Sequence, residues 1–318
     1  MEQENLSISN FKTFLLKLLL PLLAILILIL SFFNFFFENE IILSNSVSGA
    51  SKINRIINET HYNEIPIFGS SAAEGGYIPE IIGNNYYNYG ITGTRVDVML
   101  MMLKEECKKT KKSPLIIANF DLDGIDHSLA NLANYIYNSN YGPIKKLLGD
   151  RYQIKYSVPA FKYYGFYENY LQAYLNSKMQ SSKYVNKGAY IDKNIIEKKI
   201  FDELVEKRKE TKTKFFSEKK LTDELFSLIQ SNNNRLFIFV VPPYHKSYFE
   251  KYQNLNVANK FLNDLDKLKN VKVLDFSKLQ LSDSSFHNTS HLNYHGALIF
   301  SQMLKDSLAL LNIPLPNK

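Results

Sequence analysis

The 318-residue sequence has no tryptophan, only one cysteine and very little arginine. A single cysteine excludes a disulfide within the chain. Val96, Leu100 and Leu103 precede it at helical spacing, which predicts that Cys107 is a small residue on the packed face of a helix. No Cys-x-x-Cys motif occurs and the six histidines lack the spacing of zinc ligands, so we expect no metal and no cofactor.

Acidic residues are in the minority, and the formal net charge is +7. The lysines and glutamates before the first apolar stretch cancel, so the excess lies on the rest of the chain. A basic surface suits an anionic cell envelope or a polyanionic glycan, although a lysine-rich solvated surface is an equally good explanation. The lysines are scattered, which argues against a nucleic-acid partner. Abundant Lys, Asn and Ile with little Arg indicates an AT-rich bacterial genome.

One long hydrophobic run is present, from Leu18 to Phe37, and it is long enough to span a bilayer. Lys12 and Lys17 precede it, and acidic residues follow it. The positive-inside rule therefore predicts a cytoplasmic N-terminus and an extracytoplasmic main domain at the cell membrane. A cleaved signal peptide is the alternative, but the run is too long and no small-x-small site follows. The expected division is a tail (1–13), an anchor (14–37), a linker (38–60) and one domain (61–318).

Short apolar runs alternate with helical patterns in this domain. Strands are predicted at 65–69, 86–90, 115–120, 235–241 and 271–275, and helices at 95–109, much of 247–269, and 295–311. This alternation predicts an α/β fold, a three-layer αβα sandwich with a five-stranded, mainly parallel sheet. A helical insert at about 127–230 begins with many tyrosines, which form either a substrate wall that stacks on sugar rings or an ordinary core.

Ligands of such sheets bind beyond the carboxyl ends of the strands. Gly69, Ser70 and Ser71 follow the first strand at this edge and precede a helix start. A hydroxyl nucleophile there would have its own backbone N–H available to an oxyanion. It also needs a base, and histidine can take its proton near neutral pH. The Gly-x-Ser-x-Gly elbow is absent, which disfavours the α/β-hydrolase fold.

Three sequence blocks resemble those of the SGNH (GDSL-type) hydrolases, in particular a membrane-anchored branch that includes teichoic-acid D-alanyl transfer proteins and alginate O-acetyltransferases. They are Gly-Ser-Ser at 69–71, Asn-Tyr-Gly-Ile-Thr-Gly at 88–93, and His-Leu-Asn-Tyr-His-Gly at 291–296. The resemblance covers about residues 60–125 and 235–311. It implies Ser71 as nucleophile with Ser70 as the alternate, Gly93 as an oxyanion-hole donor, and His291 as base.

Two positions depart from the family pattern. The aspartate expected three residues before the histidine is Asn288, which cannot stabilise an imidazolium as a carboxylate does. The site is then a Ser–His dyad, or another acid such as Asp283 replaces the aspartate, or activity is weak. The family's third block supplies an asparagine donor, but Asp121 stands in that place. Asp121 is therefore protonated, turned away, or replaced as oxyanion donor by Asn119.

His245 follows the fourth strand and is a possible substrate contact, although a histidine there more often only holds a loop. His287 and His295 flank the base and are expected to be structural or solvated. The resemblance implies a serine acyl esterase or O-acyltransferase that modifies a cell-envelope polysaccharide or teichoic-acid-like polymer, beside a membrane-bound O-acyltransferase. The alternative is a degenerate SGNH fold that binds glycan or such a partner without chemistry.

Overall fold

A computed structural model gives the fold of the protein. It describes residues 2–59, 61, 63–109, 113–126, 132–149, 155–179 and 181–311, with side chains from residue 11 onward.

A five-stranded sheet forms the centre of the domain, and all its neighbouring strands are parallel. In spatial order its strands are β2 (Tyr86–Asn88), β1 (Ile65–Phe68), β3 (Leu115–Asn119), β8 (Leu236–Val241) and β9 (Val271–Asp275). The predicted strands and the predicted α/β fold class are confirmed. The strands read as continuous apolar runs because helices cover both faces, as parallel sheets require.

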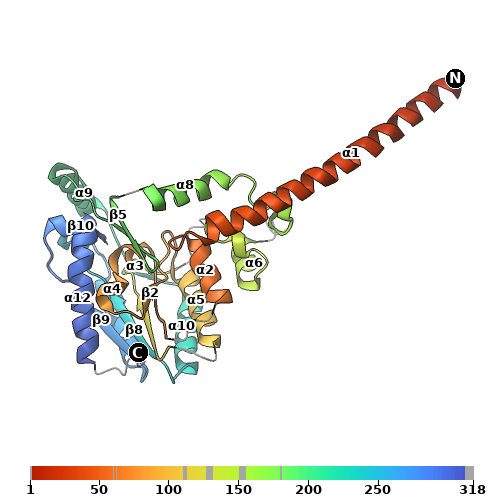
Figure 1. Ribbon diagram of the computed structural model, residues 1–318. Coiled ribbons are helices and arrows are strands. Elements are labelled where there is room, and N and C mark those ends of the chain that lie inside the picture. The colour runs from red at the N-terminus through yellow and green to blue at the C-terminus, as the bar shows by residue number, and fades with distance from the viewer. Residues whose placement is uncertain are drawn as a thin grey trace.

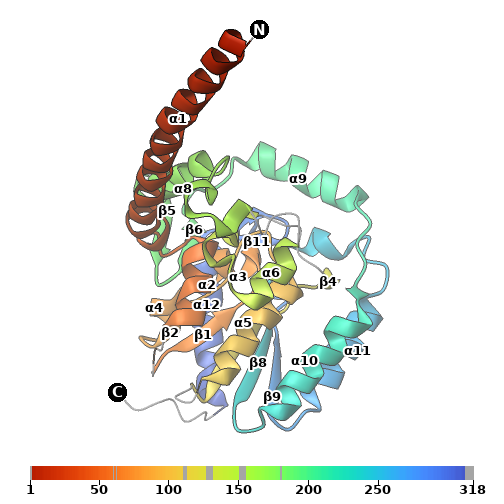
Figure 2. The ribbon, with the colours of Figure 1, turned by 90° about the vertical axis from the view of Figure 1, so that its right-hand side faces the viewer.

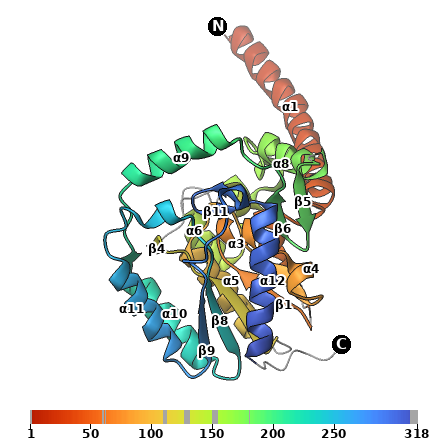
Figure 3. The same ribbon diagram turned by 90° about the vertical axis from the view of Figure 1, so that its left-hand side faces the viewer.

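Two layers of helices complete the sandwich. One face packs against α2 (Gly49–Asn58), α5 (Val96–Lys108), α10 (Lys219–Ser231) and α11 (Leu255–Asp266). The other packs against α3 (Ser71–Gly76), α4 (Pro79–Ile82) and α12 (Tyr294–Leu310). Figure 3 shows α12 across the sheet from α10 and α11, and Figure 2 shows the first layer.

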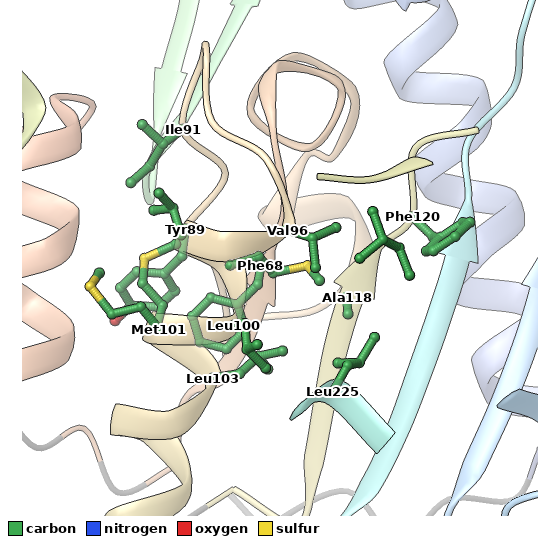
Figure 4. Close-up of a cluster of buried hydrophobic side chains, with 14 of the residues drawn as sticks. Phe68, Tyr89, Ile91, Val96, Leu100, Met101, Leu103, Ala118, Phe120 and Leu225 are labelled. Atoms are coloured by element: carbon green, nitrogen blue, oxygen red, sulfur yellow. The ribbon is translucent and has the colours of Figure 1, made fainter. Parts of the chain in front are cut away.

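The packing of α5 shows how sequence spacing becomes a core. Leu100 and Leu103 recur on one face of the helix and are almost fully buried. They lie against Phe68 of β1, with Ala118 of β3 in the same cluster (Figure 4). Cys107 packs at the edge of this cluster and is half-buried. Its predicted place on the packed face of a helix is therefore confirmed, although it is not in the deep core.

Residues 38–60 are not the linker that the sequence predicts. They contain a π-helical turn, η1 (Glu38–Leu43), and the helix α2, which begins at the cap residue Ser48. Ile42, Ile53 and Ile56 are each about 1 % exposed or less and belong to the main core. Serine and asparagine in this segment serve as caps and turn residues around a buried helix.

The insert is shorter than predicted because α10 belongs to the sandwich: Leu221, Leu225 and Ile229 are buried in the main core. Its own elements are η2 (Leu132–Asn134), η3 (Ile136–Asn138), α6 (Gly142–Leu148), η4 (Pro159–Phe161), α8 (Tyr167–Met179), β5 (Lys183–Asn186), β6 (Ala189–Asp192) and α9 (Lys198–Glu210). Short β4 (Gly124–Ile125) pairs with β7 (Phe216–Ser217). Tyr163 and Tyr170 are buried. Of the two roles considered for the tyrosines of the insert, these two residues have that of ordinary core.

The helix α1 (Glu2–Phe37) extends away from the domain (Figure 1). Among the described residues, the stretch Phe11–Leu43 is the one helix long and apolar enough to cross a membrane. It leaves the domain at the end where the carboxyl edge of the sheet lies, as Figures 1 and 2 show.

Candidate active site

Ser71 is the first residue of α3, directly beyond the carboxyl end of β1. The chain turns sharply at Gly69, which has φ +156°, and a side chain there would lie 2.7 Å from both Ala73 and Asn119. Only glycine fits this approach. Ser70 is the N-cap, and its Oγ accepts a hydrogen bond from the backbone N–H of Ala72. This geometry leaves the Ser71 side chain at the start of the helix, facing the sheet edge.

His291 is positioned by a hairpin and a helix cap. It begins β11 (His291–Leu292), which pairs with β10 (Phe286–Asn288) just before α12. Asn293 is fully buried; its Oδ1 accepts from the Gly296 N–H, and its amide donates to the Ser284 carbonyl at 2.7 Å. The block that resembles the family motif is therefore a helix-capping device that fixes the histidine.

The two ends of the chain meet at the sheet edge. Ser71 Oγ lies 2.8 Å from His291 Nε2, although the residues are 220 positions apart. This is hydrogen-bond distance for a nucleophile and its general base. The proximity expected from the sequence is present; the catalytic roles themselves stay predictions.

Asn288 completes a relay behind the histidine. Its Oδ1 lies 3.0 Å from His291 Nδ1 and accepts a hydrogen bond from the Ser290 backbone N–H at 3.0 Å. A backbone N–H can only donate, so the amide oxygen, not the amide nitrogen, must face it. The same oxygen then accepts from Nδ1–H, which leaves Nε2 unprotonated and able to take the Ser71 proton. The amide thus orients the ring and sets its tautomer, but it brings no charge.

These residues open into a cavity of about 230 Å³. Of the predicted site residues, its walls include Ser70, Ser71, Gly93, Asp121 and His291. Gly93 has φ +78°, and no atom lies within 4 Å of the place where a Cβ would stand. The structure therefore places Ser71, Gly93 and His291 on the walls of one cavity.

The turn that carries Gly93 is fixed by the second block. Asn88 is fully buried; its Oδ1 accepts from the Gly90 N–H at 2.9 Å, and its amide donates to the Ala73 and Tyr77 carbonyls. A side chain at Gly90 would lie 2.4 Å from the Glu74 backbone nitrogen. The spacing of asparagine and glycine in this block is thus what lets the loop lie against α3.

Asn119, which the sequence offered as one possible oxyanion donor, does not line the cavity. It is 3 % exposed. Its Oδ1 accepts from the Tyr77 hydroxyl and its Nδ2 donates to Asp121 Oδ1, both at 2.8 Å. In this structure Asn119 therefore lies behind Asp121 and positions its carboxyl group.

Asp121 lies at the cavity wall beside Ser70. Its Oδ2 accepts a short hydrogen bond from the Ser70 hydroxyl, and its Oδ1 accepts from Asn119. Burial raises the pKa of Asp121 to about 6, and the nearby Asp123 adds to this shift. The carboxyl therefore changes charge within the range in which the site would work.

Burial also lowers the pKa of His291 below its ordinary 6.5, and the neighbouring His287 acts in the same direction, while Asp123 opposes it. A neutral imidazole is the form that can act as a base. Arg95 Nη1 lies 3.9 Å from Asp123 Oδ2 and 3.5 Å from Asp126 Oδ1, so the Asp123 carboxylate is part of an ion-pair cluster at the cavity.

Six residues of the cavity wall were not among the predicted site residues: Ala72, Thr94, Arg95, Asp123, Tyr244 and Ser290. Each of them lies next to a predicted site residue in the sequence or within two positions of one, so neighbourhood in the sequence was an available signal.

His245, expected as a possible substrate contact, does not line the cavity. It is 4 % exposed, caps η5 (Lys246–Phe249) by accepting from the Ser247 N–H, and packs edge-on between Phe201 and Phe286. Its Nε2 faces Asp283 at 3.2 Å, so Asp283 is paired there and does not substitute for the missing aspartate beside His291. His287 lies 3.5 Å from Asp192, and His295 is exposed.

In the part of the chain that the structure describes, no three His, Cys, Asp or Glu side chains are grouped as a metal site requires. Fold and site together define an α/β protein with a serine–histidine pair at the carboxyl edge of a parallel sheet. No protein-family model and no curated protein matches the sequence. A solved structure described as "a putative platelet activating factor from Streptococcus pneumonia" is similar at 13% identity and TM-score 0.41, over 86% of this chain and 96% of that chain.

Proposed function

We propose that the protein is a membrane-anchored SGNH-type serine acyl esterase or O-acyltransferase that modifies a cell-envelope polysaccharide or teichoic-acid-like polymer outside the cytoplasm. The distance of 2.8 Å between Ser71 Oγ and His291 Nε2, inside a cavity, is the observation that carries this proposal. The asparagine relay behind the histidine and the position of Gly93 on the wall of the same cavity support it. Lys12 and Lys17 before the apolar run, and Glu38 and Glu40 after it, support the orientation.

In the proposed reaction Ser71 Oγ attacks the carbonyl carbon of an acyl ester, and its proton passes to His291 Nε2. The negative charge that forms on the carbonyl oxygen is held by the backbone N–H groups of Ser71 and Gly93. His291 then gives the proton to the leaving alcohol, which departs and leaves the acyl group on Ser71. Water or a sugar hydroxyl finally takes the acyl group, with His291 as the base for that attack.

A fluorophosphonate probe tests the proposal, because it reacts covalently only with an activated serine. We expect the wild-type protein to be labelled, Ser71→Ala to lose the label, and Ser70→Ala to keep it. Ser70 is the matched control because it adjoins Ser71 and lines the same cavity. Labelling that is lost in Ser70→Ala and kept in Ser71→Ala would contradict the assignment of the nucleophile.

A second candidate is an SGNH fold that has lost its chemistry and binds glycan or a membrane-bound O-acyltransferase. The two substitutions at the site favour it: Asn288 stands for an acid, and Asp121 stands for a neutral donor. Absence of labelling in well-folded wild-type protein would favour this candidate. For an active enzyme, hydrolysis and transfer are distinguished by the products from p-nitrophenyl acetate. Hydrolysis gives free acetate, whereas transfer to an added polysaccharide gives an acetylated polysaccharide.

A further inference from the structure

Exposed apolar side chains lie beside the last turns of α1. Val158, Phe161 and Tyr164, which we call the collar, are 36 %, 46 % and 69 % exposed. They belong to η4 and the residues next to it, and η4 packs directly on α1. Solvent contact of three such side chains on one short segment is unfavourable unless a partner covers them.

Asn34 is a position on α1 against which η4 packs. This amide lies within the apolar run, yet it is 2 % exposed. It donates to the Pro159 carbonyl, and its Oδ1 accepts from the Tyr167 hydroxyl at 2.5 Å. The segment around the collar therefore covers a polar group of the helix at the level of Asn34.

The charges of α1 give the depth of that level. Lys17 is the last charged residue before the apolar run and Glu38 is the first after it. The twenty residues between them rise about 1.5 Å each and span about 30 Å, the thickness of a bilayer's hydrocarbon core. Asn34 then lies about one helical turn inside the boundary next to Glu38. An amide without a partner at this depth is costly, which explains its two hydrogen bonds to Pro159 of η4 and to Tyr167 of α8.

We propose that the collar inserts into the boundary between lipid headgroups and acyl chains, beside the point where α1 leaves the bilayer. The last turns of α1 also carry exposed phenylalanines, Phe32, Phe35 and Phe36, at the same depth as Asn34. Aromatic side chains are enriched at this depth because their rings are apolar and amphipathic. Lys155, whose Nζ donates to the Tyr164 carbonyl at 2.8 Å, is placed to meet lipid phosphates.

Contacts of Phe37 and Glu38, where α1 meets η1, with the helical insert fix the orientation of the domain relative to the bilayer. Glu38 Oε1 accepts from Lys162 Nζ at 2.5 Å and from the Tyr163 hydroxyl at 2.6 Å. The Phe37 ring packs against Tyr163, Tyr167 and Tyr170. Helix and collar therefore move together, and the sheet edge that carries the cavity lies at the same end of the domain (Figure 2). Lipid contact by the collar is independent of any reaction at Ser71.

The absence of tryptophan makes a direct test possible, because one introduced tryptophan reports on one position. The full chain, as Phe161→Trp or Tyr164→Trp, is reconstituted in phosphatidylcholine–phosphatidylglycerol vesicles whose acyl chains carry bromine, a short-range quencher. Leu28→Trp, in the exposed middle of α1, is the lipid reference, and Val257→Trp, 44 % exposed on α11, is the solvent reference.

We expect tryptophan at 161 and 164 to be quenched several-fold more than at 257, with blue-shifted emission, and nearly as strongly as at 28. Quenching at 28 alone would overturn the lipid contact and make a protein partner the occupant of the collar. Quenching at none of the four positions would overturn both the contact and the span. Circular dichroism of each variant checks that the fold is kept.

Discussion

Asn288 is the residue at which this site departs most from a serine–histidine–acid triad. In the serine-protease triad, replacing the aspartate by asparagine costs about four orders of magnitude because the histidine takes the wrong tautomer. Here the Ser290 N–H holds the Asn288 amide oxygen toward His291 Nδ1, so the histidine keeps the productive tautomer. Asn288 lacks only the negative charge that would stabilise the imidazolium, and we expect this to reduce the rate by less than a wrong tautomer does.

Asn288→Asp should therefore raise kcat/KM for p-nitrophenyl acetate by roughly tenfold to a hundredfold, less than the about four orders of magnitude that separate aspartate from asparagine in the serine-protease triad. A carboxylate there favours imidazolium and raises the pKa of His291, which burial holds below 6.5. Because the neutral form is the base, the acid limb of the pH–rate profile should move to higher pH. A double variant that also carries Ser71→Ala should be inactive, and an unchanged rate in well-folded Asn288→Asp would refute the relay.

Asp121→Asn should raise the rate above pH 7 by about tenfold, because it removes a negative charge from the cavity in which the oxyanion forms. With the pKa of Asp121 at about 6, the wild-type carboxyl is neutral below that pH and charged above it. Wild-type activity should therefore fall as the pH rises through 6, and that limb should disappear in the variant. Parallel profiles of the two proteins would contradict this role.

The same carboxyl affects stability. Its pKa is higher in the folded chain than the ordinary 3.8, so the folded state loses stability as the pH rises from about 4 through 6. At neutral pH the unfolding free energy of Asp121→Asn, measured by denaturant titration, should exceed that of wild type by about 3 kcal/mol, the equivalent of a pKa raised from 3.8 to about 6. Near pH 4 the two proteins should be equally stable. Equal stability at both pH values would show that the carboxyl is solvated.

At the level of elements, the start of α12 holds His291 in place. Asn293→Ala removes a buried cap and leaves the Gly296 N–H and the Ser284 carbonyl without partners. We expect a loss of about 1–3 kcal/mol in unfolding free energy and a lower kcat with little change in KM. Gly296→Ala should do the same, since its Cβ would lie 2.2 Å from the Ser285 carbonyl. His295→Ala, at an exposed neighbour, is the control that should behave as wild type.

Elements with regular patterns could be predicted from the sequence, and the rest could not. The five strands read as apolar runs, and His291 was recognisable because its helix start requires Asn293 and Gly296 at fixed spacing. The helix α2 was missed because its buried face includes Lys52 and Asn54 among its isoleucines, which resembles a polar linker. Tyr244 and His245 are adjacent after β8, yet only Tyr244 lines the cavity, because the His245 ring packs between two phenylalanines. The local sequence does not determine which of two neighbours faces a cavity.

For the whole molecule, the segment that leads from α1 to the sheet is part of the core. Lys52 of α2 is fully buried; its Nζ lies 2.8 Å from Glu74 Oε1 and 2.5 Å from the Gly90 carbonyl. This ion pair ties α2 to α3, which begins with Ser71, and to the loop that carries Gly93. Burial lowers the pKa of Lys52, while Glu74 acts to raise it. Removing one partner from such a pair usually costs about 3–5 kcal/mol.

A chain that begins at His61 should therefore fail to fold, whereas one that begins at Glu38 should keep a cooperative unfolding transition in detergent. The shorter chain loses the burial of Ile42, Ile53 and Ile56, each about 2 kcal/mol, and leaves Glu74 buried without Lys52. Together these losses are about 10 kcal/mol, which is comparable to the whole net stability of a domain. Thermal melts followed by circular dichroism compare the two chains. A cooperative melt of the shorter chain near that of the longer one would show that residues 38–60 are a linker after all, so that the anchor and the site would not be mechanically joined.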